Sequence, residues 1–591
     1  MGDAGGTWNV INDVLNRNRE TKSKDISLLQ NGILINNNEQ IANIFNEYFS
    51  KIGTNLSNNI ENIDNISAED FFHVRQNASI QIQLTDEDEI IELVSDLSDA
   101  SGGPDTIPTK IMKQVIHTII TPLTHICNIS LTTGIFPQHL KLSKITPLHK
   151  QGNKQLYENY RPISILNCFS KILEKLMFNR LNKFFNDNDI LIPNQHGFTK
   201  SKSTTSAILQ LTDYVLKSFD QKKFVIGIFL DFKKAFDTVD HNILLTKLEN
   251  YGIRDITLKW VTSYLSDRKH FTQIGDQKSQ TLTLTHSIPQ GSILGPLLFN
   301  IYINDLINCT NKLELILFAD DSCFYTSNHN LTQLIENANL ELNNIKNWTI
   351  ANKLTLNIDK SHYIIFKRRR KLPTEIPQLN INNLPLELVE DTKFLGLIVQ
   401  SDLKWNQHIK ILTNKLHKYS SIIYLIKHCL DKNSLKQIYY GLVYSFLVYA
   451  NVIWGKSPMQ HLKPLITAQK RIIRTIMNRD RLHHTNLDFY NLGFLKFQDI
   501  ITYFASIFVF KSLNEFAHPF NYFNTTGNEH HYNLRNSQNL RPPLTLSLQS
   551  QSSPSYYCCS IWNNLPEHIK NRTSVASFKF GMKQHLLSSY L

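Results

Sequence analysis

The sequence lacks any long uninterrupted apolar run. Its most apolar stretch, residues 442–454, is too short to span a membrane and is interrupted by Ser445 and Asn451. The first twenty residues also lack a basic segment followed by an apolar one, the pattern of a secretory signal peptide. We therefore expect a soluble protein inside the cell, nuclear or cytoplasmic, with no membrane partner.

Cysteine is scarce as well, with 7 residues in a chain of 591. None has the Cys-x-x-Cys or Cys/His spacing that is typical of zinc sites. The count is odd, and the neighbours Cys558 and Cys559 are poorly placed to form a disulfide with each other. These features exclude a disulfide-stapled scaffold and fit a reducing compartment.

Acidic residues become rare in the last third of the chain. Residues 1–400 contain 40 Lys and Arg against 42 Asp and Glu, whereas residues 401–591 contain 22 against 8. The formal net charge of +12 therefore arises entirely from the C-terminal part. A basic region of this kind suits a polyanionic partner such as nucleic acid, although a merely solvated basic surface is the alternative.

The periodicity of the apolar residues divides the chain. Residues 8–60 are predicted to be helical, 61–100 are acidic, and 101–108 are rich in turn formers. From about 140 to 400 short β-rich runs alternate with helices, an α/β pattern, and from 401 onward helices dominate. The strongest strand predictions are residues 224–230, 313–319, 322–326 and 363–366.

Three aspartates stand at the ends of predicted strands. Asp231 directly follows the apolar run 224–230, and Asp320 with Asp321 joins two apolar runs in what reads as a tight hairpin. Brought together, such carboxylates form an oxygen-only cage for Mg²⁺. Nucleotidyl transfer uses two ions about 3.5–4 Å apart in a cage of this kind. A solvated turn is the alternative for the Asp-Asp pair alone.

Seven motifs occur in a fixed order around these aspartates. They are ITPLHKQGNKQLYENYRPISILNCFSKILEKLMFNRL, NQHGFTKSKST, IFLDFKKAFDTVDH, HSIPQGSILGPLLFNIYINDL, LFADD, ANKLTLNIDKSHYIIF and KFLGLIVQ. This series resembles the reverse transcriptases of non-LTR, LINE-type retrotransposons, especially the jockey-like branch. The core of the resemblance covers about 140–400, and further similarity lies at 31–53, 452–457 and 560–587.

The resemblance implies a role for each matching residue. Asp231, Asp320 and Asp321 are the catalytic acids and ligands of two Mg²⁺ ions, with Mn²⁺ as an alternative. Phe236 matches the aromatic wall that excludes a sugar 2′-hydroxyl. The other matches are nucleotide-pocket residues and a primer-grip hairpin: Gln290, Gly291, Arg161, Lys150 and Lys360 for the pocket, and Phe394, Leu395 and Gly396 for the grip. The sequence departs from the pattern at Ser201 and Ser287, where many relatives carry glycine.

The segment HLKPLITAQKRIIRTIMNRDR has apolar residues at helical spacing with basic residues between them. We predict that Lys463, Lys470, Arg471 and Arg474 face outward and contact a template–primer duplex through its phosphates. The basic run 367–371 allows three interpretations: a nucleic-acid contact, a nuclear import signal or a solvated hairpin tip. In the tail, Trp562, Phe578 and Phe580 are predicted to pack in a core rather than stack on bases.

The resulting expectation is an α/β right-hand polymerase, with fingers and an antiparallel palm sheet, a helical thumb and a helical C-terminal region. The predicted domains are an N-terminal helical extension (1–100), fingers and palm (101–400), a basic thumb (401–485) and a C-terminal region (486–591). The resemblance implies RNA-templated addition of dNTPs to a DNA primer or target. Relatives carry an endonuclease domain before the polymerase, and this sequence is expected to lack it.

Three alternatives remain at this point. An RNA-dependent RNA polymerase shares the palm acids but usually has a smaller, polar residue in place of Phe236. An intron maturase or telomerase-like enzyme shares the palm but not the IWG and WNNLP segments. The third is a catalytically inactive or domesticated nucleic-acid-binding remnant, which the presence of all three acids disfavours. Template preference, target site and oligomeric state do not follow from the sequence.

Overall fold

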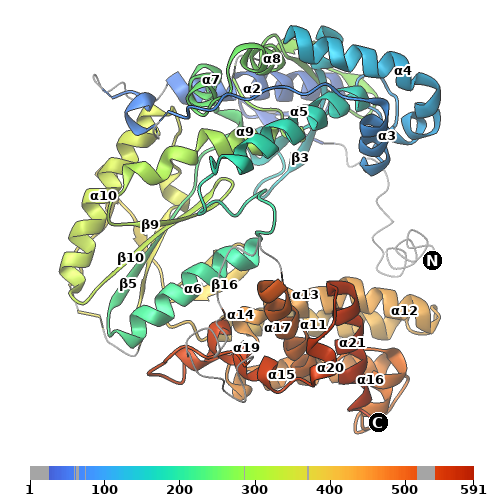
Figure 1. The fold of residues 1–591 in the computed structure, drawn as a ribbon, viewed down its shortest axis with the longest axis vertical. Coiled ribbons are helices and arrows are strands. Elements are labelled where there is room, and N and C mark those ends of the chain that lie inside the picture. The colour runs from blue at the N-terminus through green and yellow to red at the C-terminus, as the bar shows by residue number, and fades with distance from the viewer. Residues whose placement is uncertain are drawn as a thin grey trace.

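The computed structural model describes residues 26–58, 60, 66–72, 75–284, 286–368, 372–373, 375–381, 383–514, 523 and 539–591. Figure 1 shows two lobes that stand on either side of an opening and are joined by a twisted sheet. The upper lobe contains α2–α5 and α7–α9, and the lower lobe contains the helices that follow residue 405.

The joining sheet has five strands in the order β14-β11-β5-β10-β9. All pairings are antiparallel except that between β11 and β14. β5 is the central strand, and its side chains alternate between two apolar clusters, so both faces are covered. A strand buried on both faces must be apolar throughout, which is why residues 224–230 form a continuous apolar run. Its strands are β5 (Phe224–Leu230), β9 (Glu314–Phe318), β10 (Asp321–Asn328), β11 (His362–Phe366) and β14 (Glu387–Leu388).

A second sheet lies in the upper lobe, in the order β4-β3-β6-β7 with β8 also paired to β6. β3 and β6 run parallel, whereas β3 and β4 form an antiparallel hairpin. The strands are β3 (Leu142–His149), β4 (Tyr160–Ile165), β6 (Lys269–Ile274), β7 (Gln277–Lys278) and β8 (Leu282–Thr283). Three two-stranded hairpins complete the β-structure of the described residues: β1 (Leu28–Gln30) with β2 (Ile33–Ile35), β12 (Asn380–Ile381) with β13 (Leu384–Pro385), and β15 (Asp391–Phe394) with β16 (Leu397–Gln400).

Helices cover both sheets. Those of the upper lobe and the joining sheet are α2 (Asn38–Asn58), α3 (Glu87–Asp96), α4 (Thr109–Thr133), α5 (Cys168–Asp187), α6 (Thr204–Asp220), α7 (His241–Asn250), α8 (Asp255–Leu265), α9 (Gly295–Tyr302) and α10 (Leu331–Ala351). Short 3₁₀ helices include η4 (Tyr157–Asn159), η5 (Ala235–Asp237), η6 (Asn304–Cys309) and η7 (Ile358–Lys360). By length and composition α4 is apolar enough to cross a membrane, which is weak evidence because one face of it packs on α3 and α8.

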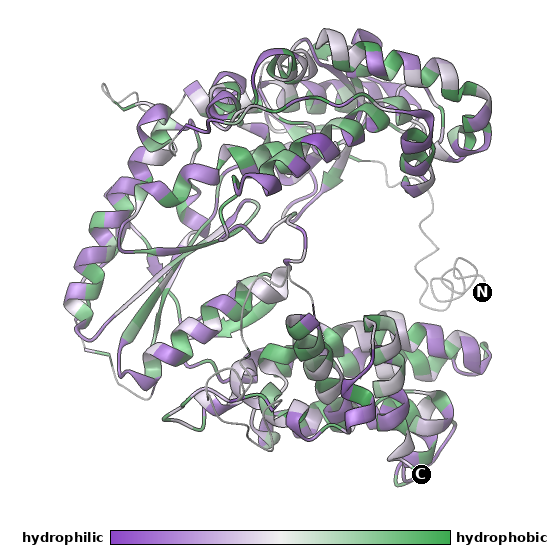
Figure 2. Cartoon of the chain, viewed as in Figure 1, coloured by the Kyte–Doolittle hydropathy of each residue, from purple (hydrophilic) through white to green (hydrophobic). Residues whose placement is uncertain are grey.

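The lower lobe is helical. It contains α11 (Asn406–Ile426), α12 (Lys432–Tyr439), the π-helix η8 (Tyr440–Tyr444), α13 (Ser445–Val448), α14 (Asn451–Trp454), α15 (Met459–Ile476), α16 (Asn486–Leu492), α17 (Phe497–Asn514), α19 (Pro554–Asn563), α20 (Glu567–Lys570) and α21 (Val575–Ser588). Figure 2 shows apolar and polar residues alternating along these helices. Their apolar sides form one continuous core with α6 and one face of the joining sheet.

The structure confirms the four strongest strand predictions and the helical character of the chain after residue 401. The prediction of helix throughout 8–60 is wrong for residues 28–35, which form the β1–β2 hairpin. Asn31 and Gly32 occupy its turn, both at positive φ (51° and 79°). An Asn-Gly pair between apolar runs is a strong signal for this turn type, and it outweighs the helical spacing. The part of that prediction before residue 26 lies outside the described residues.

The structure also tests the predictions made for the cysteines and for the aromatic residues of the C-terminal tail. All seven cysteines are free, in agreement with the sequence. Trp562 and Phe578 are buried and stack with ring centroids 5.9 Å apart, as predicted. Phe580 was predicted to pack but is 67% exposed, because it lies on the outer face of α21. The boundaries drawn at residues 100, 400 and 485 stay predictions.

Candidate active site

The three aspartates meet at one end of the joining sheet. β5 pairs with β10 so that Leu230 lies opposite Ser322, which places Asp231 beside the β9–β10 turn. Phe318 pairs with Asp321, so Ala319 and Asp320 form a two-residue turn, and Ala319 takes a φ of 54°. The register of the two antiparallel pairs therefore gathers carboxylates that are about 90 positions apart in the sequence.

Because the three carboxylates are close together, the negative charge of each makes ionisation of the others less favourable. Burial raises the pKa of Asp320, and the nearby charge of Asp231 raises it further. Asp321 keeps an exposed side chain, yet desolvation by the surrounding atoms and the charges of Asp320 and Asp231 raise its pKa to about 6. Within the described residues none of the three forms an ion pair with Lys or Arg. Such a cluster favours neutralisation by a bound cation.

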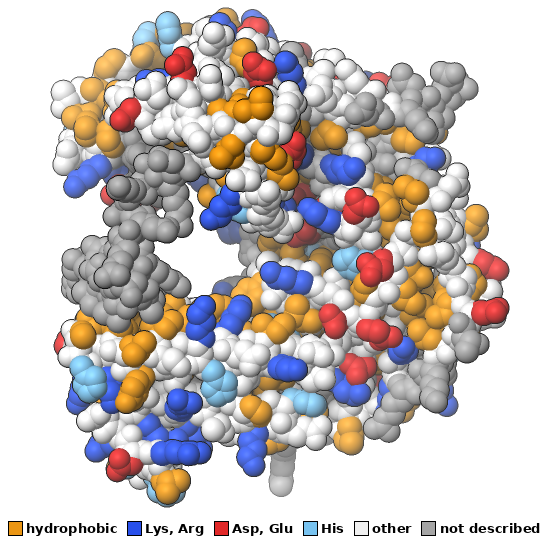
Figure 3. All heavy atoms as spheres, turned by 180° about the vertical axis from the view of Figure 1, so that it is seen from behind, with side chains coloured by type: hydrophobic (Ala, Val, Ile, Leu, Met, Phe, Trp, Pro, Cys, Tyr) orange, Lys and Arg blue, Asp and Glu red, His pale blue; other side chains and the backbone are white. Residues whose placement is uncertain are grey.

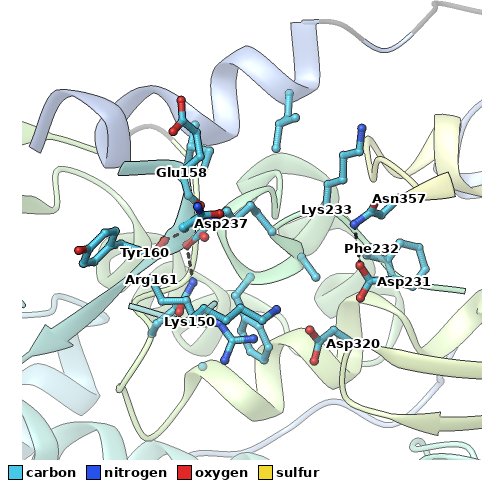
Figure 4. Close-up of a pocket in the computed structure, with 18 of the residues that line it drawn as sticks. Lys150, Glu158, Tyr160, Arg161, Asp231, Phe232, Lys233, Asp237, Asp320 and Asn357 are labelled. Atoms are coloured by element: carbon cyan, nitrogen blue, oxygen red, sulfur yellow. Dashed lines mark hydrogen bonds between the residues drawn. The ribbon is translucent and has the colours of Figure 1, made fainter. Parts of the chain in front are cut away.

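Asn357 holds one of these carboxylates in place. Its Nδ2 donates to Asp231 Oδ2 at 2.8 Å, and its backbone N–H donates to the Asp231 carbonyl at 2.8 Å. The Asp231 N–H in turn donates to Ser361 Oγ at 3.1 Å. The end of β5 is thus tied to the segment around η7, which fixes where Asp231 points (Figure 4).

Three basic side chains face the aspartates. Lys150 follows β3, Arg161 lies on β4 and Lys360 ends η7. Burial lowers the pKa of Lys150, and the positive charges of Arg161 and Lys360 lower it further, while Asp231 and Asp320 oppose this shift. Figure 4 shows Lys150 and Arg161 in the same pocket as Asp231 and Asp320. Repulsion among these cations favours a polyanionic ligand such as a phosphate chain.

The far wall of the pocket is built from η5 and the Pro-Gln-Gly turn. Phe236 stacks on Phe299, with ring centroids 4.5 Å apart, so its ring has a fixed position at the edge of the core. Gln290 accepts a backbone hydrogen bond from Ser164 on β4 at 2.8 Å. Gly291 has a φ of 118°, and a Cβ there would lie 2.6 Å from the Ser164 carbonyl oxygen, so only glycine fits without a shift.

These groups line one cavity of about 740 Å³. Eight of the predicted site residues line it: Lys150, Arg161, Asp231, Phe236, Gln290, Gly291, Asp320 and Lys360. Asp321 does not line the cavity, but it directly follows Asp320, which does. Among the described residues no three His, Cys, Asp or Glu side chains are close enough together to be recognised as a metal site. The donor chemistry nevertheless fits a hard divalent cation, because Asp231 and Asp320 offer oxygen only and neither forms an ion pair within the described part of the chain.

Comparison with known proteins agrees with this geometry. The family model "Reverse transcriptase (RNA-dependent DNA polymerase)" matches residues 148–399, the span that contains the whole cation and carboxylate cluster. Residues 148–399 form a reverse transcriptase domain. The five-stranded joining sheet lies within these residues, whereas β3 of the second sheet begins before them.

Similar proteins are the polymerases of mobile elements. The chain is 28% identical over 408 residues to the probable RNA-directed DNA polymerase from transposon BS of Drosophila melanogaster, covering 66% of this chain and 44% of that protein. It is 26% identical over 402 residues to the one from transposon X-element (65% and 43%) and 24% over 385 residues to that of mobile element jockey (63% and 42%), both of Drosophila melanogaster. The chain spans less than half the length of these relatives.

A solved structure of apo telomerase from Candida tropicalis shares 13% identity, with a TM-score of 0.32, over 48% of this chain and 59% of that chain.

The predicted primer grip of the reverse transcriptase domain is a hairpin. Phe394 pairs with Leu397 at the end of β15 and β16, and Leu395 and Gly396 form the turn with φ values of 44° and 87°. The hydroxyl of Tyr449, in the lower lobe, donates to the Leu395 carbonyl at 2.5 Å, which ties the hairpin to the helices below it. Whether this hairpin holds a primer stays a prediction.

The predicted nucleic-acid contacts of α15 are not brought to the pocket. Leu462, Leu465, Ile472, Ile473 and Ile476 are buried, which confirms the apolar side of the helix. Lys463 and Arg471 are exposed, but Arg474 donates from Nε to the His483 carbonyl at 2.8 Å and so serves the local fold. In the view of Figure 1, α15 lies low in the lower lobe, away from the opening. A duplex contact by Lys463, Lys470, Arg471 and Arg474 stays a prediction.

Three pocket features escaped the sequence interpretation. Asn357 stands in the quoted motif LTLNIDK, but nothing in the motif indicates its hydrogen bond to Asp231. Asp237 follows Phe236 directly and bonds to Gln290, 53 positions away. The helix α2 contributes Tyr48 and Ile52 to the lining although it precedes the matched domain by about 90 residues.

Of the basic run 367–371, residues 369–371 lie outside the described part, and Lys367 pairs with Glu390 at 3.0 Å.

Proposed function

We propose that the chain is an RNA-directed DNA polymerase that adds dNTPs to a primer 3′-hydroxyl on an RNA template. One observation carries this proposal. The carboxylates Asp231 and Asp320 face the cations Lys150, Arg161 and Lys360 across a single cavity, and all five residues belong to the matched span 148–399. Nucleotidyl transfer needs both features together, because the triphosphate is a polyanion and the attacking hydroxyl must be activated beside it.

Asp231 and Asp320, with Asp321 beside them, would hold two Mg²⁺ ions, for which Mn²⁺ can substitute. When bound, the ions supply Lewis-acid activation of the hydroxyl and neutralise charge that develops on the phosphates. Asn357 orients Asp231 through Oδ2, and Oδ1, which accepts no hydrogen bond from the described residues, would take this role. Because both acids sit at the ends of paired strands, their separation is fixed before substrate binds.

The basic residues would bind the phosphates of the substrate, and Phe236 would contact its sugar. Arg161 presents a planar fork of donors that suits phosphate oxygens, and Lys150 adds a positive charge beside it. The positive charge of Lys360 is near enough to lower the pKa of Lys150. Lys360 would balance the charge of departing pyrophosphate. Phe236, fixed by stacking on Phe299, would meet a 2′-hydroxyl and so favour dNTPs over rNTPs.

The opening between the lobes offers a path for a template–primer duplex. Figure 3 shows Lys and Arg side chains on both margins of this opening, seen from behind. Together with the basic excess of residues 401–591, this favours binding to phosphate backbones without sequence readout. We also propose that the chain acts in the nucleus or cytoplasm and has no membrane partner.

The proposal is tested by primer extension with the purified chain, a DNA primer annealed to an RNA template, and Mg²⁺. We expect dNTP incorporation that EDTA abolishes and that Asp231→Asn reduces by at least a thousandfold. Phe236→Ala should leave dNTP incorporation measurable while raising rNTP incorporation, which separates this function from that of an RNA polymerase. Duplex binding without any extension by the wild-type chain would refute the proposal and favour a binding remnant.

A further inference from the structure

A second cavity of about 740 Å³ lies between the joining sheet and the lower lobe. Its walls come mainly from the residues after β11, those between β16 and α11, those between α14 and α15, and residues 546–552 before α19. It shares no lining residue with the catalytic cavity. Lys367 follows Phe366, which pairs with Val225, six positions before Asp231. At about 3.3 Å per residue, this end of the sheet lies about 20 Å from the catalytic aspartates.

The cavity has an excess of positive charge. Four basic side chains line it: Lys367, Arg368, Lys404 and Lys456. Lys367 pairs with Glu390 at 3.0 Å, and Lys404 pairs with Asp402 at 2.7 Å. Arg368 and Lys456 form no ion pair within the described part of the chain. Lys456 is held in place, because its Nζ lies 5.6 Å from the centroid of the Tyr557 ring. Two cations therefore remain for an anionic ligand.

Two long helices add to this charge. The lining residues Trp405 and Pro458 are the N-caps of α11 and α15, so both helices begin at the wall of the cavity. Neither N-cap side chain accepts a hydrogen bond from its helix. The N-terminus of a helix carries a partial positive charge, which strengthens the attraction that the unpaired cations exert on phosphate groups.

The same cavity presents apolar surface. Leu546 and Leu548 line it, although their residues are 81% and 85% exposed. Their segment is fixed to the wall, because Gln549 Nε2 donates to the Asp402 carbonyl at 2.6 Å. A ligand that covers these leucines gains from removing them from water. Single-stranded nucleic acid offers both phosphates and uncovered base faces, whereas a duplex stacks its bases inside.

We propose that this cavity is a second nucleic-acid site, which binds a single strand with its phosphates on Arg368 and Lys456 and its bases against Leu546 and Leu548. Of the three interpretations of the basic run 367–371, this one assigns its first two residues to a nucleic-acid contact. Most of the site lies after residue 399 and so outside the matched span. The inference concerns binding and does not require the proposed polymerase activity.

The test is binding of a fluorescent oligo(U) or oligo(dT) of about 20 nucleotides to the full chain, measured by anisotropy over a range of salt concentrations. Excess unlabelled RNA–DNA duplex is present, so that the opening between the lobes is occupied. In Arg368→Gln with Lys456→Gln, the slope of log K against log salt should shrink by about 1.4, since each single-strand phosphate contact contributes about 0.7. The affinity at about 0.1 M salt should then fall about twentyfold. The strand that shows this loss, RNA or DNA, is the ligand.

The matched control is Arg368→Lys with Lys456→Arg, which keeps both charges and should retain most of the affinity. Leu546→Ser with Leu548→Ser should weaken binding without changing the salt slope, and thermal melting checks that each variant is folded.

Wild-type affinity in the glutamine double variant would overturn the inference. So would complete displacement of the labelled strand by the duplex, or equal competition by a polyglutamate of the same charge, which would show attraction to any polyanion. None of these readings involves primer extension, so a failure of the proposed function is seen separately.

Discussion

Replacing Gly291 by alanine should damage both the stability and the activity of the reverse transcriptase domain. The new Cβ would lie 2.6 Å from the Ser164 carbonyl oxygen, and a backbone φ of 118° is unfavourable for any residue with a Cβ. The conformational strain costs about 1–3 kcal/mol. Moving the turn away from β4 also stretches the 2.8 Å bond from the Ser164 N–H to the Gln290 carbonyl, worth about 1 kcal/mol. The free energy of unfolding should fall by about 2–4 kcal/mol.

The same shift carries Gln290 and Phe236 out of position, because Ile288 of the turn donates to the Phe236 carbonyl at 3.1 Å. We therefore expect kcat/KM for dNTP incorporation to drop about ten- to hundredfold, measured by single-nucleotide extension beside urea unfolding. Gly441→Ala is the matched control, since nothing lies within 4 Å of its Cβ position in a helical segment. Gly291→Ala behaving like Gly441→Ala in both assays would refute the reasoning.

Three further predictions concern the surroundings of the pocket. Ser287 has a φ of 88° at a position where glycine is expected from the resemblance, so Ser287→Gly should raise the unfolding free energy by about 0.5–1 kcal/mol in urea titration. Gly53→Ala should place a Cβ 2.4 Å from the Asp237 carbonyl oxygen, lowering stability by about 1–3 kcal/mol and relaxing discrimination against rNTPs. Burial raises the pKa of Asp237 to about 6, above its value of 3.8 in the unfolded chain. The folded state then binds more protons between these values, so stability falls as pH rises from 4 to 6. Asp237→Asn should remove on the order of 3 kcal/mol of that fall, measured as the difference between the two unfolding curves. Equal pH dependence in both chains would contradict this assignment.

The parts of the fold that the sequence predicted are those controlled by local pattern. The run 224–230 is apolar throughout because β5 is covered on both faces, and such a run is recognisable without a structure. Asp231 follows β5 directly and Asp320 lies in the β9–β10 turn, as their flanking apolar runs predict, and the strand register brings these two points together. The β1–β2 hairpin was also signalled locally, by Asn31 and Gly32, but the helical spacing of nearby apolar residues concealed it.

Contacts between distant residues could not be predicted. The bond from Asn357 to Asp231 joins positions 126 apart, and that from Gln290 to Asp237 joins positions 53 apart. Each depends on how two separate elements pack, which no local pattern encodes. The basic residues of α15 show the same limit. Their spacing predicted an outward face, but not the direction in which the packed helix turns that face.

The measurement that tests the central claim most directly is RNA-templated dNTP incorporation by Asp320→Asn beside Asp359→Asn. Asp320 lines the cavity with Asp231, whereas Asp359 is an exposed aspartate on η7 outside the lining. If Asp320 holds the catalytic cations, its substitution should abolish Mg²⁺-dependent extension, and Asp359→Asn should extend the primer at a rate close to that of the unmodified chain. Extension by Asp320→Asn at the unmodified rate would contradict the assignment of this carboxylate cluster as the active site.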